Sequence, residues 1–167
     1  MMMNYQRRDY EPCGMAFVEA WLDEQAVAAT GLDEGFRSFY ECWVKEEGFV
    51  PGESFWCKVV FEKDIPLAVA AFCRREQTIL IMELLVDPKK RGCGIGTRLL
   101  QTLLESEEII SAAIERSEAV IFPENLASQR AFQKAGYYCH HRYEDGSALL
   151  YVYEKPNTKK LRIGGSV

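Results

Sequence analysis

Residues 84–100, LLVDPKKRGCGIGTRLL, join an apolar strand to a helix through a turn with glycines at every second position. The first amides of a helix have no partner within it, and the helix dipole makes this end positive, so it attracts phosphate. Gly94 and Gly96 lack the Cβ atoms that would keep a bulky phosphate away from these amides. Basic residues at 89–91 add mobile positive charge. The segment therefore predicts a turn that binds a diphosphate.

Hydrophobic spacing on either side of this turn predicts a chain of helices followed by strands and then by further helices. Aromatic and aliphatic residues recur at helical intervals before residue 50, and β-branched and aromatic residues dominate from residue 54. We expect helices at 16–29, 33–47, 94–105, 107–115 and 127–135, and strands at 5–10, 54–62, 66–74, 78–86, 119–122, 137–143 and 148–154. The strands between residues 54 and 86 would form an antiparallel meander.

Length and charge set limits on the class of protein. The 167 residues predict one domain at 1–156, followed by a basic, frayed tail at 157–167. A nucleic-acid-binding protein usually has a basic surface, so the net charge of −5 argues against nucleic acid as a partner. The same charge is compatible with a cationic substrate such as an amine. No apolar run approaches the ~20 residues of a membrane-spanning helix, so we expect no membrane partner.

The cysteines and histidines give no sign of a metal site. The six cysteines are scattered, and no apolar core of a secretory signal follows the N-terminal charges. Both features predict free thiols in a cytoplasmic protein. Cys139, His140 and His141 are adjacent, but no second pair of ligands accompanies them, so we expect no metal.

The spacing of the glycine turn distinguishes between phosphate-binding motifs. A Rossmann G-x-G-x-x-G pattern that starts at Gly92 would need glycine at 97, where Thr97 stands. A pattern that starts at Gly94 fails at Leu99, and the Gly-Lys-Ser/Thr ending of a P-loop is absent. What remains is Arg91-x-x-Gly94-x-Gly96, after Val-x-Pro at 86–88.

This pattern resembles the acetyl-CoA-binding motif of the GNAT superfamily of N-acetyltransferases. A second segment, NLASQRAFQKAGY at 125–137, is similar to the family's other motif, an Asn before a helix that ends in Gly and an aromatic residue. The resemblance implies an α/β (α+β) fold with a mixed, mostly antiparallel central sheet. Helices would cover both faces, and the strands would splay at the acetyl-CoA site. Residues 1–50 would supply the acceptor-side helices, and residues 51–156 the core.

The resemblance also implies roles for the cofactor-binding residues. Backbone groups of Leu84, Leu85 and Val86 would pair with the pantetheine arm. Asn125 would bond to the pantetheine, and Ser128 would lie near it. Amides of the turn would hold the pyrophosphate, and these belong to Arg91, Gly92, Cys93, Gly94, Ile95, Gly96 and Thr97. The alternative for the glycines is a plain strand-to-helix turn with no ligand.

Glu83 is the best candidate for a catalytic base. It is the only charged residue in the apolar strand expected at 78–86, and desolvation of a carboxylate raises its pKa. Many members of the family carry a Glu on this strand that acts through water. The alternative is a Glu that reaches solvent or pairs with an arginine.

Phe132 departs from the family pattern, because many relatives have a general-acid tyrosine at this position. Phenylalanine cannot donate a proton, so Tyr138 or a water would have to serve. Tyr137 replaces an apolar core residue, and its hydroxyl would serve packing alone. Cys93 is expected to point away from the phosphates.

The sequence therefore predicts an acetyl-CoA-dependent N-acetyltransferase that acts on a primary amine of a small molecule or a peptide. Glu83 would be its base, Tyr138 a candidate acid, and a homodimer its candidate assembly. An alternative is a non-catalytic acyl-CoA-binding regulatory module of the same fold, and a further one is the transfer of longer acyl chains or O-acylation. The acceptor itself has no recognisable motif in this chain.

Overall fold

A computed structural model describes residues 5–106 and 113–156. Seven strands form one sheet in the order β1-β2-β3-β4-β5-β7-β6, and every pair is antiparallel except β4 with β5. The strands are β1 (Gln6–Asp9), β2 (Phe55–Glu62), β3 (Ile65–Arg75), β4 (Thr78–Val86), β5 (Arg116–Ile121), β6 (Tyr138–Arg142) and β7 (Leu149–Glu154). This confirms the predicted mixed, mostly antiparallel sheet.

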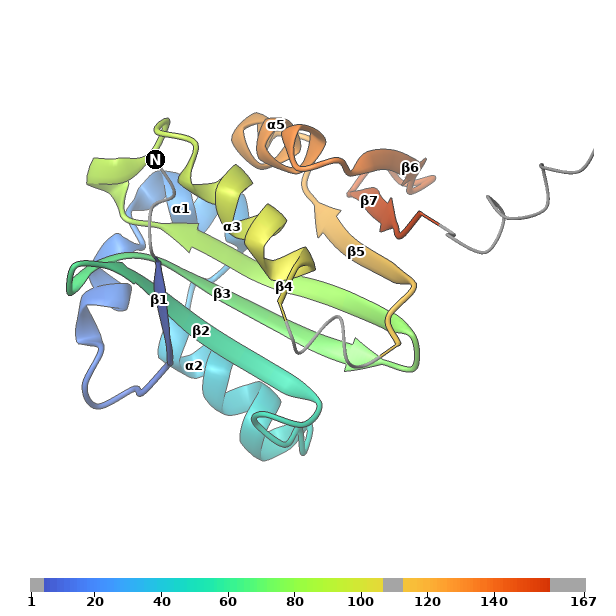
Figure 1. The fold of residues 1–167 in the computed structure, drawn as a ribbon. Helices are drawn as coiled ribbons and strands as arrows, with labels where there is room; N and C mark the ends of the chain where they lie inside the picture. The colour runs from blue at the N-terminus through green and yellow to red at the C-terminus, as the bar shows by residue number, and fades with distance from the viewer. Residues whose placement is uncertain (1–4, 107–112, 157–167) are drawn as a thin grey trace, which may run out of the picture.

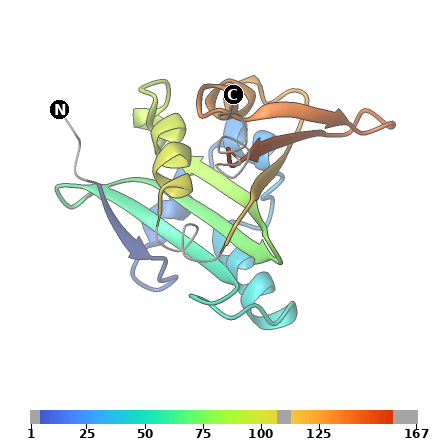
Figure 2. The same ribbon diagram turned by 45° about the vertical axis from the view of Figure 1, so that its right-hand side comes forward.

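Helices cover both faces of the sheet, as predicted (Figures 1 and 2). The α-helices are α1 (Glu24–Thr30), α2 (Phe36–Glu41), α3 (Ile95–Leu104) and α5 (Leu126–Lys134), with 3₁₀ helices η1 (Ala16–Trp21) and η3 (Pro88–Lys90) and the π-helix η2 (Cys42–Glu46). One core cluster joins α3 and α5 to the sheet, and another joins η1, α1 and α2 to its opposite face. Strand side chains alternate between the two clusters, as a sheet covered on both faces requires. None of the helices in the described segments has the length and apolar character needed to cross a bilayer.

The predicted helix at 16–29 was wrong as a single element. Asp23 lies in extended backbone between η1 and α1, and its side chain accepts a hydrogen bond from the Ala26 N–H at 2.8 Å. An aspartate in this position caps a new helix, so the chain stops after η1 and starts again. Similarly, the helix expected at 33–47 begins only at Phe36, after Gly35 with its φ of 93°, and continues from α2 into η2.

The C-terminal half follows the prediction with shifted bounds. β5 begins at Arg116 rather than at residue 119, because Arg116 and Glu118 occupy the outward positions of a strand whose inward positions are buried. Residues 113–115 are not helical, and the rest of the helix expected at 107–115 lies outside the described residues. The predicted tail at 157–167 also lies outside them.

β4 and β5 separate before either strand ends, and this separation positions the site. Their last paired residues are Ile81 and Ala119, whereas β4 continues to Val86 and β5 to Ile121. The gap between the two strands is visible in Figure 1. Backbone groups of β4 beyond Ile81 that point toward β5 therefore have no strand partner there, which confirms the predicted splay.

Candidate active site

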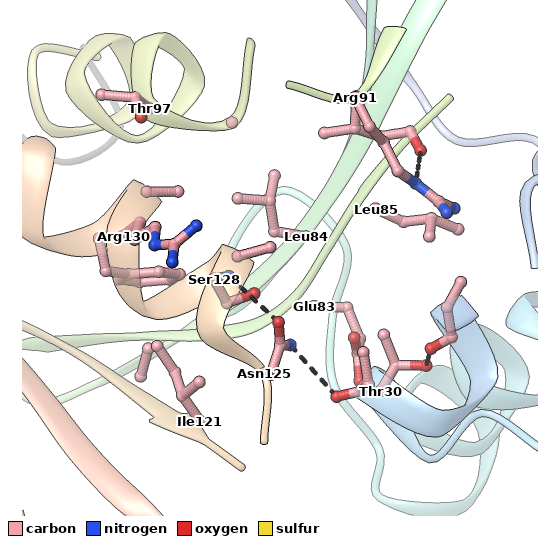
Figure 3. Close-up of a pocket in the computed structure, with 18 of the residues that line it drawn as sticks. Thr30, Glu83, Leu84, Leu85, Arg91, Thr97, Ile121, Asn125, Ser128 and Arg130 are labelled. Atoms are coloured by element: carbon pink, nitrogen blue, oxygen red, sulfur yellow. Dashed lines mark hydrogen bonds between the residues drawn. The ribbon is translucent and has the colours of Figure 1, made fainter. Parts of the chain in front are cut away.

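A pocket of about 760 Å³ opens where β4 and β5 separate (Figure 3). Five parts of the chain line it: helix α1, the ends of both strands, the glycine turn with the start of α3, and helix α5. Most of the predicted cofactor residues are brought together here, namely Leu84, Leu85, Val86, Arg91, Gly92, Gly94, Ile95, Gly96, Thr97, Asn125 and Ser128. Cys93 is exposed and is not among the lining residues, in agreement with the expectation that it points away.

The glycine turn presents backbone amides to the pocket. Gly94 is the N-cap of α3 with φ 77°, and no side chain caps the helix. The first N–H groups of α3 therefore have no side-chain partner and are available to an anion. A Cβ atom on Gly96 would lie 3.7 Å from Leu84 and 3.8 Å from Ala131, so its absence lets α3 sit close to β4 and α5.

Two basic residues of α5 add charge beside this turn, and sequence reasoning gave them no role. Arg130 and Lys134 are four residues apart, so they lie on one side of α5, and both line the pocket. With Lys90 they are exposed, and within the described segments no carboxylate pairs with any of the three. Figure 3 shows Arg130 on the side of the pocket nearest Thr97. The sequence did contain a sign of this site, because two cations four residues apart in a predicted helix lie on the same side of it.

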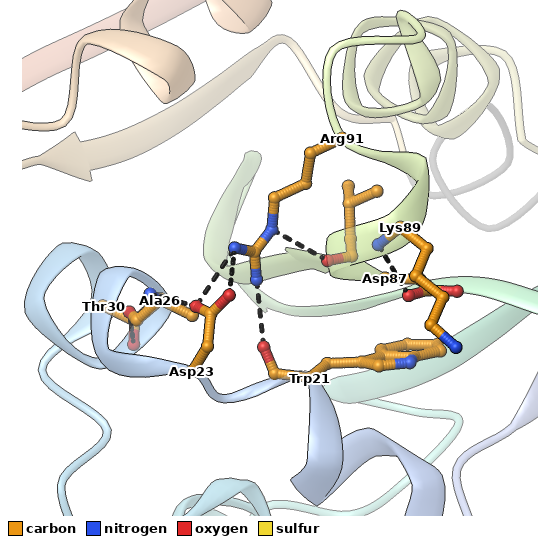
Figure 4. A network of polar contacts seen from close by, with 8 residues as sticks. Trp21, Asp23, Ala26, Thr30, Asp87, Lys89 and Arg91 are labelled. Carbon is orange, nitrogen blue, oxygen red and sulfur yellow. Dashed lines mark hydrogen bonds and ion pairs between the residues drawn. The ribbon is translucent and has the colours of Figure 1, made fainter.

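Arg91 does not supply the mobile charge that was predicted, and this expectation was wrong. Its Nη1 bonds to both carboxylate oxygens of Asp23, at 3.1 and 2.8 Å (Figure 4). Its Nη2 donates to the carbonyl of Trp21 at 3.0 Å, and its Nε donates to the carbonyl of Val86 at 3.3 Å. Arg91 thus links the glycine turn to the residues at the start of α1. The Ala26 N–H and the Arg91 guanidinium together hold the pKa of the Asp23 carboxyl below its usual value.

Glu83 is directed to the α1 side of the sheet by a bulge in β4. Glu83 pairs with Ala71 and Ile81 pairs with Phe72, so Met82 is an extra residue in β4. Leu84 then packs toward α3 and Leu85 toward the N-terminal helices. Glu83, adjacent to Leu84, therefore faces α1, and Figure 3 shows its side chain extending toward Thr30.

The Glu83 carboxyl is partly exposed to the pocket but is largely removed from bulk water. Desolvation raises its pKa to about 8 from the ordinary 4.5. Among the described residues, none forms an ion pair or a hydrogen bond with it. The alternative in which Glu83 pairs with an arginine therefore has no support in this geometry. An unpaired carboxyl with a pKa near 8 is able to exchange protons at neutral pH.

Asn125 connects the start of α5 to α1. Its Oδ1 accepts a hydrogen bond from the Ser128 N–H at 3.1 Å and so caps α5. Its Nδ2 donates to the carbonyl of Ala29 at 3.4 Å. One Nδ2 hydrogen remains for another acceptor. Asn125 and Ser128 line the pocket, and Figure 3 shows Asn125 between Ser128 and Thr30.

No tyrosine of the described segments lines the pocket. Phe132 does line it, and it is buried against the ring of Tyr137 at a centroid distance of 4.9 Å. The Tyr137 ring is buried in the core as expected, but its hydroxyl does more than pack, because it forms a hydrogen bond with the Ser117 hydroxyl at 2.8 Å. Burial raises the pKa of Tyr137 to about 12. Tyr138 lies on β6, is 45% exposed and does not reach the pocket, so the structure does not bring the predicted acid to Glu83.

A family-level comparison matches residues 15–137 to the Acetyltransferase (GNAT) family. The chain belongs to this family. It is an acetyl-CoA-dependent family, as the resemblance of the two motifs implied. Groups of three or more potential metal ligands do not occur in the part of the chain that the structure describes.

One curated relative of this GNAT protein is named for an amine acceptor. The chain is 36% identical over 81 residues to an L-2,4-diaminobutyric acid acetyltransferase of Marinococcus halophilus. This match covers 47% of the chain and 46% of that relative, so the chain spans about half the length of the curated relative it matches.

Solved structures of the same fold cover almost the whole chain. An aminoglycoside acetyltransferase, AAC(6')-Ib, with coenzyme A and kanamycin has a TM-score of 0.70 at 17% identity, over 91% of this chain and 95% of that one. Spermidine N-acetyltransferase of Vibrio cholerae with CoA and spermine has a TM-score of 0.69 at 11% identity, over 90% and 95%. At these identities the likeness shows the fold.

Proposed function

We propose that this protein is an N-acetyltransferase that transfers the acetyl group of acetyl-CoA to a primary amine of a small molecule or a peptide. The observation that carries the proposal is the Glu83 carboxyl. It is unpaired among the described residues, its pKa is raised to about 8, and it lies in a pocket between the glycine turn and α1. A proton acceptor in this position suits the deprotonation of an amine.

The residues beside the glycine turn suit acetyl-CoA, which supplies the acetyl group as a thioester. Uncapped amides at the start of α3 fit the pyrophosphate. Lys90, Arg130 and Lys134 offer further positive charge to its phosphates. The open edge of β4 from Glu83 to Val86 fits an extended pantetheine arm that pairs with the backbone as an additional strand. The free hydrogen of the Asn125 amide can bond to the same arm.

Glu83 would take the proton that the amine must lose, directly or through a water. A free amine has a pKa near ~10.4, so it is protonated at neutral pH and cannot attack. When the ammonium enters the pocket, its charge lowers the pKa of Glu83 and favours the carboxylate. The ammonium first loses one proton to the Glu83 carboxylate, which releases it to solvent water. As the neutral amine then forms the C–N bond, the C–S electron pair leaves with the thiolate and the second N–H proton passes to Glu83. A backbone N–H at Leu85 or Val86 would meet the negative charge that develops on the carbonyl oxygen.

The leaving thiolate needs no dedicated acid. The pKa of a CoA thiol should lie near the ~8.5 of cysteine, so release of the thiolate at pH 7 costs only about 2 kcal/mol. This agrees with Phe132 at the position of the family's tyrosine and with the exposed location of Tyr138. We therefore propose that water protonates the thiolate after it leaves.

Phe132 also favours a second candidate function, a non-catalytic acyl-CoA-binding module. The two are distinguished by incubating the wild-type protein and the Glu83→Gln variant with acetyl-CoA and a panel of amines. Free CoA and acetylated amine are quantified by chromatography, because the exposed Cys13, Cys93 and Cys139 would react with a thiol reagent. We expect both proteins to bind acetyl-CoA and only the wild type to turn over rapidly. Binding without acetylation of any amine would favour the module.

The structure tests neither the cellular location nor the assembly that the sequence predicts. A cytoplasmic protein and a homodimer remain predictions. Size-exclusion chromatography with light scattering measures the assembly directly.

A further inference from the structure

The pocket has two ends of different character. The donor end comprises the glycine turn and the pocket-facing side of α5. The acceptor end is the part of the wall on the α1 face of the sheet, formed by Ala26, Ala29, Thr30, Glu83, Val120 and Phe122. Val120 belongs to it because its neighbours Ala119 and Ile121 pack toward α3 and α5, which directs Val120 to the opposite face, the face of Glu83.

Apolar side chains are unusually exposed at the acceptor end. Val120 is 58% exposed and Phe122 is 41% exposed, and both line the pocket. The Phe122 ring reaches Gly31, the C-cap of α1, where a Cβ atom would lie 3.9 Å from it. Phe122 therefore closes the C-terminal end of α1. With Ala26 and Ala29 on the helix, it offers a ligand an apolar surface beside Glu83.

Charge is distributed unevenly between the two ends. Lys90, Arg130 and Lys134 belong to the donor end, and Arg91 is neutralised by Asp23. Of the described residues that line the acceptor end, Glu83 alone is charged. A ligand at this end therefore meets one acidic group, which an ammonium converts to the carboxylate, and no basic group.

The polar groups near Glu83 are mostly engaged with the backbone. The Thr30 hydroxyl donates to the Ala26 carbonyl at 2.8 Å and accepts from the Leu32 N–H at 3.3 Å. Asn125 bonds to Ser128 and Ala29. Gln25 contributes one uncharged amide to the wall. A second charge on the ligand would thus lose water without gaining an ionic partner, which is strongly unfavourable.

Resting on the proposed function, we propose that the acceptor is a primary monoamine with an apolar carbon skeleton. The single ammonium is met by Glu83, and the skeleton lies against Val120, Phe122 and the alanines of α1. A diamine has no carboxylate for its second ammonium at this end. An amino acid acceptor brings a carboxylate that has no cationic partner at this end and that Glu83 repels once the ammonium has ionised it. The chain would then differ in acceptor from relatives named for diaminobutyrate, spermidine and aminoglycosides.

Three acceptors with the same four-methylene chain test this proposal: 1-aminopentane, 1,4-diaminobutane and 5-aminopentanoate. They differ only in the distal group, which is a methyl group, an ammonium and a carboxylate. We expect kcat/KM for 1-aminopentane to exceed that for each of the others by at least about tenfold. From 1-aminopropane to 1-aminopentane it should rise about fourfold with each buried methylene.

Two variants at Val120 move the preference in opposite directions. Val120→Asp places a carboxylate at the acceptor end and should raise the ratio of diamine to monoamine kcat/KM about tenfold. Val120→Lys should raise the ratio of 5-aminopentanoate to monoamine kcat/KM by a similar factor. The side chain is exposed, so neither change disturbs the core. Val50→Asp is the matched control, because Val50 is 48% exposed and does not line the pocket. Its acceptor ratios should equal those of the wild type.

The outcomes separate this proposal from the proposed function. If the diamine or the amino acid is the best wild-type acceptor, or if Val120→Asp leaves the ratio unchanged, the acceptor class is wrong and the acetyltransferase activity stands. If acetyl-CoA binds but neither these three acceptors nor any other amine of the panel is acetylated, both proposals fail.

Discussion

The donor end and the acceptor end of the pocket are built in different ways. The donor end presents backbone amides, which depend on glycines and a helix start within residues 92–97. The acceptor end presents side chains from α1, β4 and β5, which are far apart in the sequence. A ligand held by backbone can be inferred from a short motif. A ligand held by side chains from three elements requires the fold to be known.

The largest effect is expected at Glu83, the acidic residue of the acceptor end. Glu83→Gln keeps the shape and removes the base, so kcat/KM for the best amine should fall by about 10³, within the usual range for a general base. The wild-type pH profile of kcat/KM should show an ionisation near pH 8 that the variant lacks. The ionisation of the amine near ~10.4 should remain in both. If the pH profile of kcat/KM is the same in the variant and the wild type, Glu83 is not the base.

The same variant should gain stability at high pH. The folded protein keeps the Glu83 proton up to about pH 8, whereas the unfolded chain loses it near 4.5. The folded state therefore binds more protons between these values, and the free energy of unfolding falls as pH rises through this window. At about 1.4 kcal/mol per pH unit, this amounts to a few kcal/mol above pH 8. Thermal unfolding at pH 5 and pH 9 should show a smaller loss for Glu83→Gln than for the wild type.

A change at the donor end should weaken the binding of acetyl-CoA beyond its effect on stability. Gly94 has φ 77° and open space around it, so Gly94→Ala introduces backbone strain without a clash. We expect a loss of about 1 kcal/mol in stability and about a tenfold weaker affinity for acetyl-CoA, because the turn relaxes away from its left-handed conformation.

Gly146→Ala is the matched control for this change. Gly146 has φ 72° and equally open surroundings, and it lies in the β6–β7 turn. It should lose the same stability and bind acetyl-CoA normally by calorimetry. Equal binding in both variants would show that the glycine turn does not hold the cofactor.

The contrast between the two ends explains what could be predicted from the sequence. The turn before α3, the helix after Asn125 and the strand that carries Glu83 depend on local patterns, and these elements were predicted correctly. That the turn binds a diphosphate stays a prediction. The bulge at Met82, which directs Glu83 to the α1 face, depends on pairing with β3. The Asp23–Arg91 contact joins residues 68 positions apart, so the charge of Arg91 was misjudged. Tyr138 was a candidate because of its position in the chain, but β6 places it away from the pocket.

Arg130 tests whether side chains also contribute at the donor end. It is exposed and unpaired among the described residues, so Arg130→Ala should leave stability unchanged and weaken acetyl-CoA about fivefold at low salt. The difference should shrink as salt is raised, because exposed charges are screened. Arg142→Ala on β6, exposed and outside the pocket, is the control and should bind acetyl-CoA like the wild type. If Arg130→Ala and the wild type bind acetyl-CoA equally at low salt, Arg130 does not contribute and the backbone amides hold the cofactor at this end.

The smallest effect is expected from the contact that joins the two ends. Asp23→Asn retains a side-chain oxygen that can accept from the Ala26 N–H and cap α1, but it removes the charge that pairs with Arg91. Arg91 then keeps its bonds to the carbonyls of Trp21 and Val86 but has no carboxylate partner, and the start of α1 loses its ionic anchor. We expect KM for the amine to rise about threefold, while acetyl-CoA binds as before or up to about twofold more tightly.

A higher KM for the amine together with an unchanged or tighter binding of acetyl-CoA would show that the Asp23–Arg91 ion pair acts on both ends of the pocket. Asp64→Asn is the control, because it breaks the exposed ion pair with Arg8 and should change neither constant. If Asp23→Asn weakens acetyl-CoA and leaves the amine KM unchanged, Asp23 supports the glycine turn rather than α1. The comparison must be made at fixed low salt, since an ion pair at the surface contributes only about 0–1 kcal/mol and salt reduces it further.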